Sequence, residues 1–181
     1  MLGPALTNLP FKEQYIVMKK ILALLVLAVC ALPAVAGAQS ATDPAKMVQV
    51  FSNALKVDGA TLQVVILNDR TVEALFPQSP AKAALRTKGR MTTVFFIQGT
   101  VTKDFEFDPT LKAEQKGKTL DGKPSSMKNF TAGKIAKGQQ IQGMVELPEK
   151  LDLYEPFKIT LSGKTLEFRL NEDDVRDYGN R

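Results

Sequence analysis

Asp104, Glu106 and Asp108 are the residues whose types and spacing come closest to a binding site. They alternate with Phe105 and Phe107, so a strand here places the three carboxylates on one face and the two rings on the other. Carboxylate oxygens are the ligands that Ca²⁺ prefers in proteins. No glycine-bearing loop of alternating acids surrounds them. We therefore expect a solvated strand face, keep a weak calcium site as the alternative, and expect no other metal site and no cofactor.

Paired carboxylates are also the requirement for a glycosidase. Hydrolysis of a glycosidic bond needs two carboxyl groups at a defined separation, and Glu146 or Glu149 can be paired with Asp104 or Glu106. A chain with this many acids offers such pairs by composition alone, so the pattern carries little weight.

A serine–lysine pair is the other arrangement that performs acyl transfer without histidine. Ser125 and Lys128 have the Ser-x-x-Lys spacing, but that motif works at the start of a helix. Here it follows Lys123-Pro124, which predicts a loop.

The composition excludes most other catalytic chemistry. Histidine is absent from the 181 residues, and Cys30, the one cysteine, lies in a segment that we expect to be removed on export. These absences exclude Ser-His-Asp triads, cysteine nucleophiles and nearly all zinc, copper and haem ligation in the mature protein. We therefore expect a protein that is not an enzyme.

Residues 18–38 have the three parts of a signal peptide. Lys19 and Lys20 precede the apolar run Ile21–Leu32, and a small-residue site ends at Ala38. This arrangement predicts cleavage before Gln39 and a periplasmic or secreted protein. The apolar run is shorter than the roughly 20 residues that a membrane-spanning helix needs. We therefore expect no stable membrane insertion after the signal is removed.

Two further features of the N-terminal region bear on processing. Residues 1–17 resemble no part of the signal, and we expect them to be a non-native upstream extension. Cys30 ends an apolar stretch, which leaves lipidation open as an alternative, although Val29 poorly fills the small-residue position before a lipidated cysteine.

The charge of the chain argues against nucleic acid as a partner. Removal of residues 1–38 takes away Lys12, Lys19, Lys20 and Glu13, which lowers the net charge from +5 to +3. The remaining bases are interspersed with acids, whereas a nucleic-acid binder gathers them in a patch.

Helix patterns dominate the chain before Met91. Asp43-Pro44 and Ser79-Pro80 each combine a capping residue with a first-turn proline, and apolar residues follow at helical spacing. Thr61–Leu67 is a continuous apolar run rich in β-branched residues, typical of a buried strand. The predicted elements are helices over 44–57 and 80–88, a strand over 61–67 and a second strand or a turn over 71–76.

From Met91 onward the apolar residues recur at every second position, which predicts strands. The predicted strands cover 91–102, 104–108 continuing to 115, 126–136, 139–147, 156–161 and 164–170. Ser162-Gly163 separates two alternating segments and predicts a tight hairpin. We expect residues 171–181 to be a flexible acidic tail.

The order of three segments, Val94–Val101, Leu111–Gly117 and Lys134–Pro148, resembles bacterial extracytoplasmic immunoglobulin-like domains of the telokin-like kind. The positions that carry the resemblance are Lys137, Gly138, Gly143, Val145, Leu147 and Pro148. The resemblance extends over about half of the mature chain. It implies an envelope location and an immunoglobulin-like fold.

Together these features predict a mainly β protein, an immunoglobulin-like antiparallel β-sandwich with one or two short N-terminal helices. Residues 39–90 would pack on a sandwich core formed by 91–170. The expected function is an exported, non-enzymatic interaction module that contacts an envelope protein through its surface. A small-ligand or carbohydrate-binding protein is the alternative, although the chain has no Trp and only three Tyr to form an aromatic platform, and a carboxylate-dependent hydrolase is less favoured.

Overall fold

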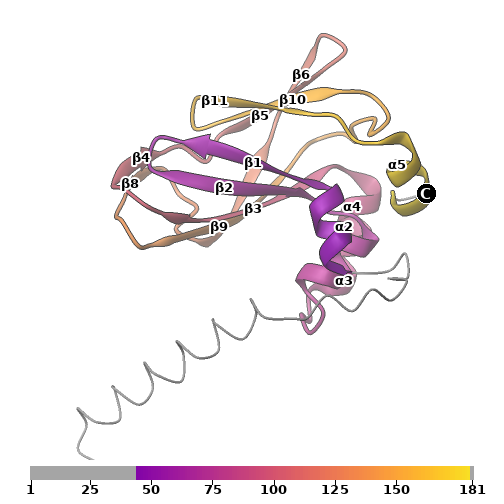
Figure 1. Ribbon diagram of the computed structural model, residues 1–181, viewed down its shortest axis with the longest axis horizontal. Helices are drawn as coiled ribbons and strands as arrows, with labels where there is room; N and C mark the ends of the chain where they lie inside the picture. Colours follow the sequence, from indigo (N-terminus) through magenta and orange to yellow (C-terminus); the bar gives the residue numbers. More distant parts are fainter. Residues whose placement is uncertain (1–43, 180–181) are drawn as a thin grey trace, which may run out of the picture. The chain divides into compact units, whose positions relative to one another are not determined.

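The computed structural model describes residues 44–179 (Figure 1). The expected signal peptide, its Ala38-Gln39 cleavage site, the segment before it and Cys30 lie outside the described residues. The elements are α2 (Pro44–Val50), β1 (Ser52–Val57), β2 (Ala60–Ile66), α3 (Asp69–Leu75), α4 (Lys82–Met91), β3 (Val94–Val101), β4 (Phe105–Phe107), β5 (Leu111–Gln115), β6 (Lys118–Asp121), β7 (Lys123–Lys128), β8 (Gly133–Ile135), β9 (Gln140–Glu146), β10 (Phe157–Leu161), β11 (Lys164–Phe168) and α5 (Glu172–Tyr178).

Two antiparallel sheets enclose the main core. The large sheet has the strand order β1-β2-β3-β9-β7, the small sheet has the order β11-β10-β5-β6, and β4 and β8 form a separate pair. Figure 1 shows β1, β2, β3 and β9 in one layer, with β5, β10 and β11 above them. Leu62 and Phe95 of the large sheet belong to the same buried cluster as Leu111 and Ile159 of the small sheet. The protein is therefore mainly β and antiparallel, as the sequence predicted.

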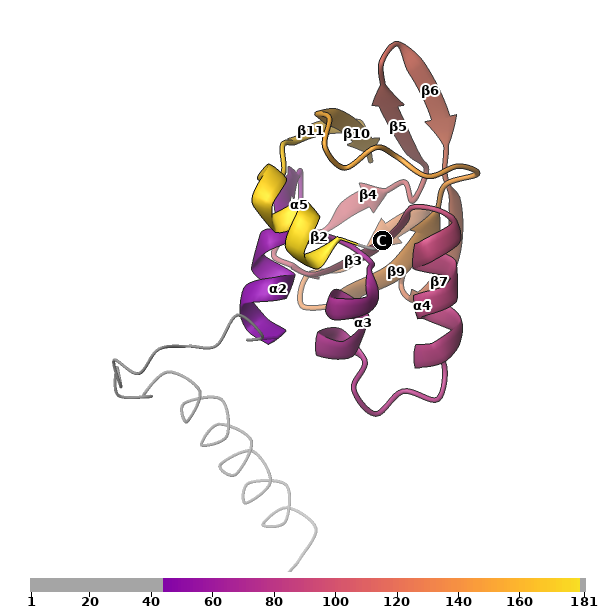
Figure 2. The ribbon, with the colours of Figure 1, turned by 90° about the vertical axis from the view of Figure 1, so that its right-hand side faces the viewer.

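A second, smaller core lies on the opposite face of the large sheet. Val65 and Phe96 point to this side and pack with Val72 of α3 and Leu85 of α4. The ring of Phe76 meets Phe96 edge-on at a centroid distance of 5.1 Å. Figure 2 shows α3 and α4 side by side at this end of the sheet. The helices thus cover only part of the outer face of the large sheet.

The first predicted helix was too long. It was expected over 44–57, but α2 ends at Val50 and β1 begins at Ser52. Within β1, Leu55 and Val57 are buried while Lys56 between them is exposed, a period of two that belongs to a strand. Pairing with β2 along its whole length decides the conformation.

The segment 71–76, predicted as a strand or turn, is helical as far as Leu75, the end of α3, and Phe76 is the C-cap. Asn68 caps this helix, because its side-chain oxygen accepts hydrogen bonds from the backbone N–H groups of Arg70 and Thr71, both at 2.9 Å. The Thr71 hydroxyl accepts in turn from the Asn68 backbone N–H at 2.8 Å. This reciprocal capping box is worth about 1 kcal/mol or more to the helix start.

The expectation of one or two N-terminal helices before the sandwich is wrong, because α3 and α4 follow β1 and β2 and α5 lies near the C-terminus. The segment expected to be a flexible acidic tail contains α5, capped by Asn171 and anchored by buried Val175. Strand β6 was not predicted. The helix expected over 80–88 is confirmed as α4, and β2, β9, β10 and β11 agree closely with their predicted ranges. None of the helices in residues 44–179 is long and apolar enough to cross a membrane.

The hairpin at Ser162-Gly163 is confirmed. Leu161 pairs with Lys164 across the two-residue turn, and Ser162 and Gly163 have φ angles of 50° and 72°. Two successive positive φ angles are the requirement of a type I′ turn, whose twist matches that of the flanking strands.

We predict that truncating either Phe95 or Phe96 to Ala costs about 3–5 kcal/mol of unfolding free energy. Alternation on a sheet with one solvated face would allow only one of these neighbours to be buried. Here they are 0% and 2% exposed because a core lies on each side. Urea unfolding of both variants is the measurement, with Thr100→Ala on the open end of β3 as the control. A loss below about 1 kcal/mol at Phe96 would contradict the second core.

Candidate functional site

Three glutamines lie side by side across the middle of the large sheet, on the face turned away from the main core. Gln63 of β2, Gln98 of β3 and Gln142 of β9 are register partners. The Gln98 Nε2 donates a hydrogen bond to Gln63 Oε1 at 2.9 Å, and Gln63 Nε2 donates to Ser52 Oγ at 3.4 Å. Since neighbouring strands lie about 4.8 Å apart, this amide row spans about 10 Å.

A second row of polar residues runs parallel to the first. Thr61, Thr100 and Gln140 are register partners on β2, β3 and β9. With the amide row they line a shallow, open depression of about 390 Å³, whose lining is Ala54, Thr61, Gln63, Gln98, Gly99, Thr100, Gln140, Ile141 and Gln142. We call this surface the polar face. Its volume falls in the range of small-ligand sites, roughly 300–1,000 Å³, but its polar lining differs from their usual apolar one.

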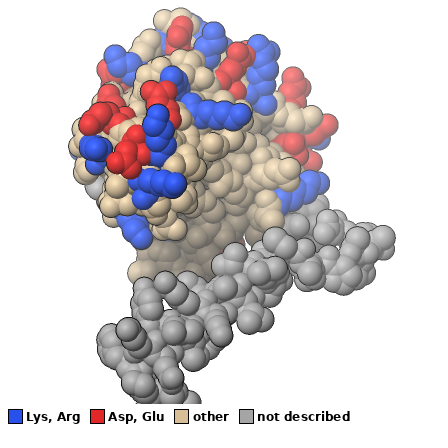
Figure 3. All heavy atoms as spheres, turned by 60° about the vertical axis from the view of Figure 1, so that its left-hand side comes forward, with Lys and Arg blue, Asp and Glu red and all other residues tan. Residues whose placement is uncertain are grey.

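The polar face contains no ionisable side chain. Lys56 and Lys128 stand at its margins, opposite Thr61 and Gln142 in the strand register, and Lys128 Nζ lies 3.4 Å from Gln140 Oε1. Figure 3 shows charged side chains gathered on the upper part of the described surface and a broad uncharged area below, on the side where the large sheet lies.

The outer face of the small sheet, unlike the polar face, is charged. Its exposed positions carry both signs of charge, among them Lys112, Glu114, Lys158 and Glu167. An antiparallel sheet commonly has one solvated face of this kind. Both surfaces belong to the same protein, in which 24% of the residues are charged, so the lack of charge on the polar face is a local property.

Ion pairs fix the helices that border the polar face. Asp69 of α3 accepts hydrogen bonds from Arg90 and Arg86 of α4, and Lys88 of α4 pairs with Glu146 of β9 at 2.6 Å. The Arg90 guanidinium, helped by Arg86, holds the pKa of the Asp69 carboxyl below its usual value. Lys88 does the same to the pKa of Glu146. These contacts attach α3 to α4 and α4 to the sheet.

The acidic residues at 104–108 are not gathered into one group of ligands. Asp104 Oδ1 accepts from the Lys137 backbone N–H at 2.8 Å, a bond that, with Lys134 nearby, lowers the pKa of Asp104. Asp108 accepts from the Thr110 backbone N–H at 2.9 Å, and Glu106 is exposed. In residues 44–179 no group of three acids is placed to hold a metal ion. The calcium alternative is therefore not supported by the geometry.

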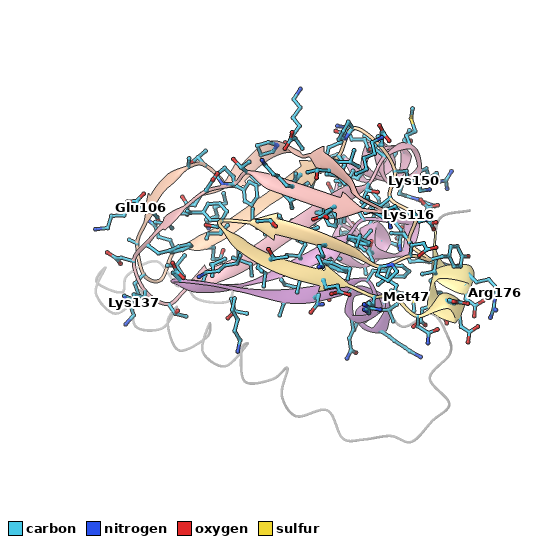
Figure 4. The ribbon with its side chains drawn as sticks, turned by 90° about the horizontal axis from the view of Figure 1, so that it is seen from above. Met47, Glu106, Lys116, Lys137, Lys150 and Arg176 are labelled. Atoms are coloured by element: carbon cyan, nitrogen blue, oxygen red, sulfur yellow. The ribbon has the colours of Figure 1, made fainter. Side chains whose placement is uncertain are left out.

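The glycosidase pairs are not brought together. Glu146 is the register partner of Val94 at the start of β3, whereas Asp104 follows the end of β3. The seven steps of about 3.3 Å from Val94 to Val101 separate the two ends of β3 by about 23 Å, and catalytic carboxyl pairs lie roughly 5–10 Å apart. Figure 4 shows the same separation, with Glu106 and Lys137 at one end of the molecule and Lys150, the neighbour of Glu149, at the other.

The serine–lysine pair also lacks its required setting. Ser125 and Lys128 lie on β7, an extended strand with a register shift near its end, and not on a helical turn. Lys128 Nζ is directed to Gln140 Oε1. Lys128 is therefore directed away from the role of a base for Ser125.

The edge strands β1, β11 and β7 are poor templates for an added strand. Asn53 of β1 donates from its Nδ2 to the Glu167 carbonyl of β11 at 3.3 Å, so these two edges face each other. The outer strand β7 carries Pro124 and a register shift between Ser126 and Lys128. Proline and irregular pairing are the usual means of protecting an edge.

The amide row was not found from the sequence. Gln98 follows the apolar run of β3 and Gln142 lies in the glutamine-rich start of β9, but only the pairing of β2, β3 and β9 places them in one line. Comparisons of the chain with known protein families, with curated proteins and with solved structures found no match. The candidate site therefore rests on the geometry of this chain alone.

We predict that Asp69→Asn lowers the unfolding free energy at pH 7 by about 0.5–1 kcal/mol. This is the magnitude expected for a solvent-exposed ion pair, since Arg86 and Arg90 are both substantially exposed. The pKa of Asp69 is lower in the folded than in the unfolded chain. Its stabilisation is therefore complete above the unfolded value near 4 and disappears as the pH falls through the folded value. The unfolding free energies of wild type and variant, measured by urea titration at several pH values, should become equal in acid. A difference that persists at pH 2 would contradict the ion-pair origin, and Glu106→Gln is the control.

Proposed function

We propose that the mature protein is an exported, non-enzymatic binding module that meets its ligand with the polar face. The observation that carries this proposal is the distribution of side chains on one sheet surface. Where Val65 and Phe96 face outward, helices cover them; where Gln63, Gln98 and Gln142 face outward, the surface is open and carries no charge. A polar but uncharged surface of this size suits contact with a neutral polar ligand.

The geometry of the other candidates supports a binding role over a catalytic one. Asp104, Glu146 and Glu149 are each engaged by lysines, with Lys118 Nζ at 2.6 Å from Glu149. A general acid needs a raised pKa, whereas the pKa values of Asp104 and Glu146 are lowered. Export through a signal peptide over 18–38 and membership of the immunoglobulin-like group both remain parts of this proposal. The two facing antiparallel sheets are compatible with that group.

A protein partner in the envelope is the second candidate, and a different set of residues favours it. Met91, Met127 and Tyr154 are 72%, 47% and 54% exposed, and none of them lines the polar face. Exposed aromatic residues and methionine are enriched in protein interfaces. They are dispersed over α4, β7 and the segment before β10, so they form no single apolar patch.

We predict that a Gln98→Lys variant fails to restore the phenotype of a strain from which the gene has been deleted, because the variant places a charge in the centre of the amide row. Complementation is the measurement. Gln78→Lys, at an exposed glutamine in the loop between α3 and α4, should complement fully. The unfolding free energies of both variants should lie within about 1 kcal/mol of the wild-type value, since at most one side-chain hydrogen bond is lost.

The same assay separates binding from catalysis. Glu146→Gln and Asp104→Asn should complement, because neither carboxylate has a role in binding at the polar face. Loss of function in either variant, with the fold intact, would replace the binding proposal with an enzymatic one. Full complementation by Gln98→Lys would show that the polar face is not the working surface.

A further inference from the structure

The geometry points to a neutral glycan chain as the ligand of the polar face, held by hydrogen bonds from the amide row. This inference rests on the proposed function and narrows it to one class of ligand. Four observations bear on it: the hydrogen-bonding groups that the face offers, its charge, its open ends and the side chains that it lacks.

The hydrogen-bonding groups of the face match those of sugar hydroxyls. A glutamine side chain offers two donors and a carbonyl acceptor, and a threonine hydroxyl both donates and accepts. In residues 44–179, the side chains of Gln142, Thr61 and Thr100 make no hydrogen bond within the chain. Gln98 uses one of its donors on Gln63 and keeps its carbonyl oxygen for a ligand. A ligand whose hydroxyls also donate and accept can satisfy all of these groups at once.

The charge of the face selects a neutral ligand. Removing a carboxylate or phosphate from water is costly unless a cation compensates for it, and the lining supplies none. Lys56 and Lys128 lie only at opposite margins, and Lys128 is already directed to Gln140. An acidic polymer would therefore leave its charges over the amides, away from any cation.

The shape of the face suits a chain better than a compact molecule. The amide row crosses three strands and the second row runs beside it, so the depression continues across the sheet and is not closed at its sides. The side chains that anchor protein interfaces, Trp, Tyr and Arg, are absent from the lining. A protein partner would have to desolvate these polar residues without gaining an apolar anchor.

Recognition by hydrogen bonds alone predicts weak binding. Each bond to water is exchanged for one to the ligand, so the net gain per contact is small. No aromatic ring lines the polar face to stack on a sugar. We expect a Kd on the order of 0.1–1 mM for a single oligosaccharide, which corresponds to a few net hydrogen bonds.

The test is an NMR titration of the ¹⁵N-labelled full chain. The probes are neutral hexasaccharides of glucose, mannose, xylose and galactose, with hexagalacturonate as the acidic counterpart. We expect at least one neutral probe to shift the side-chain NH₂ signals of Gln63, Gln98 and Gln142, with a smaller response to hexagalacturonate. Gln98→Glu should weaken binding at least tenfold, because it replaces the donor to Gln63 with an acceptor and adds a charge. The exposed Gln78→Glu is the matched control and should bind as wild type does.

Each remaining outcome overturns the inference. A response to hexagalacturonate alone would assign an acidic glycan, and a response that maps to Tyr154 or Met127 would place sugar binding elsewhere. If no neutral probe shifts the amide signals while Gln98→Lys still fails to complement, the polar face is a binding surface for another class of ligand. If Gln98→Lys also complements, both the inference and the proposed function fall.

Discussion

The pairing of β3 with β2 and β9 is the contact on which both the fold and the candidate site depend. It aligns Phe95 with Ile66 and Val145, and in the same register it aligns Gln98 with Gln63 and Gln142. Because side chains alternate between the faces of a strand, a slip of one residue would exchange the two faces. At the C-terminal end of β3 the two faces differ, and a slip would turn Val101 out of the main core and bring Thr100 into it, which makes the slip very unfavourable. The amide row is thus positioned by the hydrophobic packing of residues that it does not touch.

Two glycines allow the central strands to pack this closely. A Cβ at Gly99 would lie 2.6 Å from the Thr61 carbonyl oxygen, and one at Gly143 would lie 2.1 Å from the Phe130 ring. Both distances are far shorter than van der Waals contact. Phe130 closes the main core over β9, and Gly99 leaves room for Leu62 beneath the polar face. The absence of side chains at these two positions therefore serves the packing of both layers.

The sequence predicted the elements whose signals are local. Ser162-Gly163 defines a turn by itself, and the strands beside it alternate cleanly. It failed where a tertiary contact or a cap decides the outcome. Residues 52–57 form a strand because β2 pairs with them, and 69–75 form a helix because Asn68 and Thr71 cap each other. The amide row could not be predicted from the sequence for a related reason. Gln63 and Gln142 are far apart in the chain, and only the strand register brings them into line.

The amide row gains its value as a site from being partly ordered before any ligand arrives. Ser52, Gln63 and Gln98 form a chain of hydrogen bonds across neighbouring strands, and rigid β backbone holds their Cα positions. Immobilising a flexible side chain on binding costs roughly 0.5–1.5 kcal/mol, and in this chain part of that cost is met during folding. Gln142, outside the hydrogen-bonded chain, still bears it in full. A ligand that bridges Gln98 and Gln142 would therefore extend an existing hydrogen-bond network by one side chain. The lower ordering cost is what would let a surface without charge or aromatic rings bind a neutral molecule.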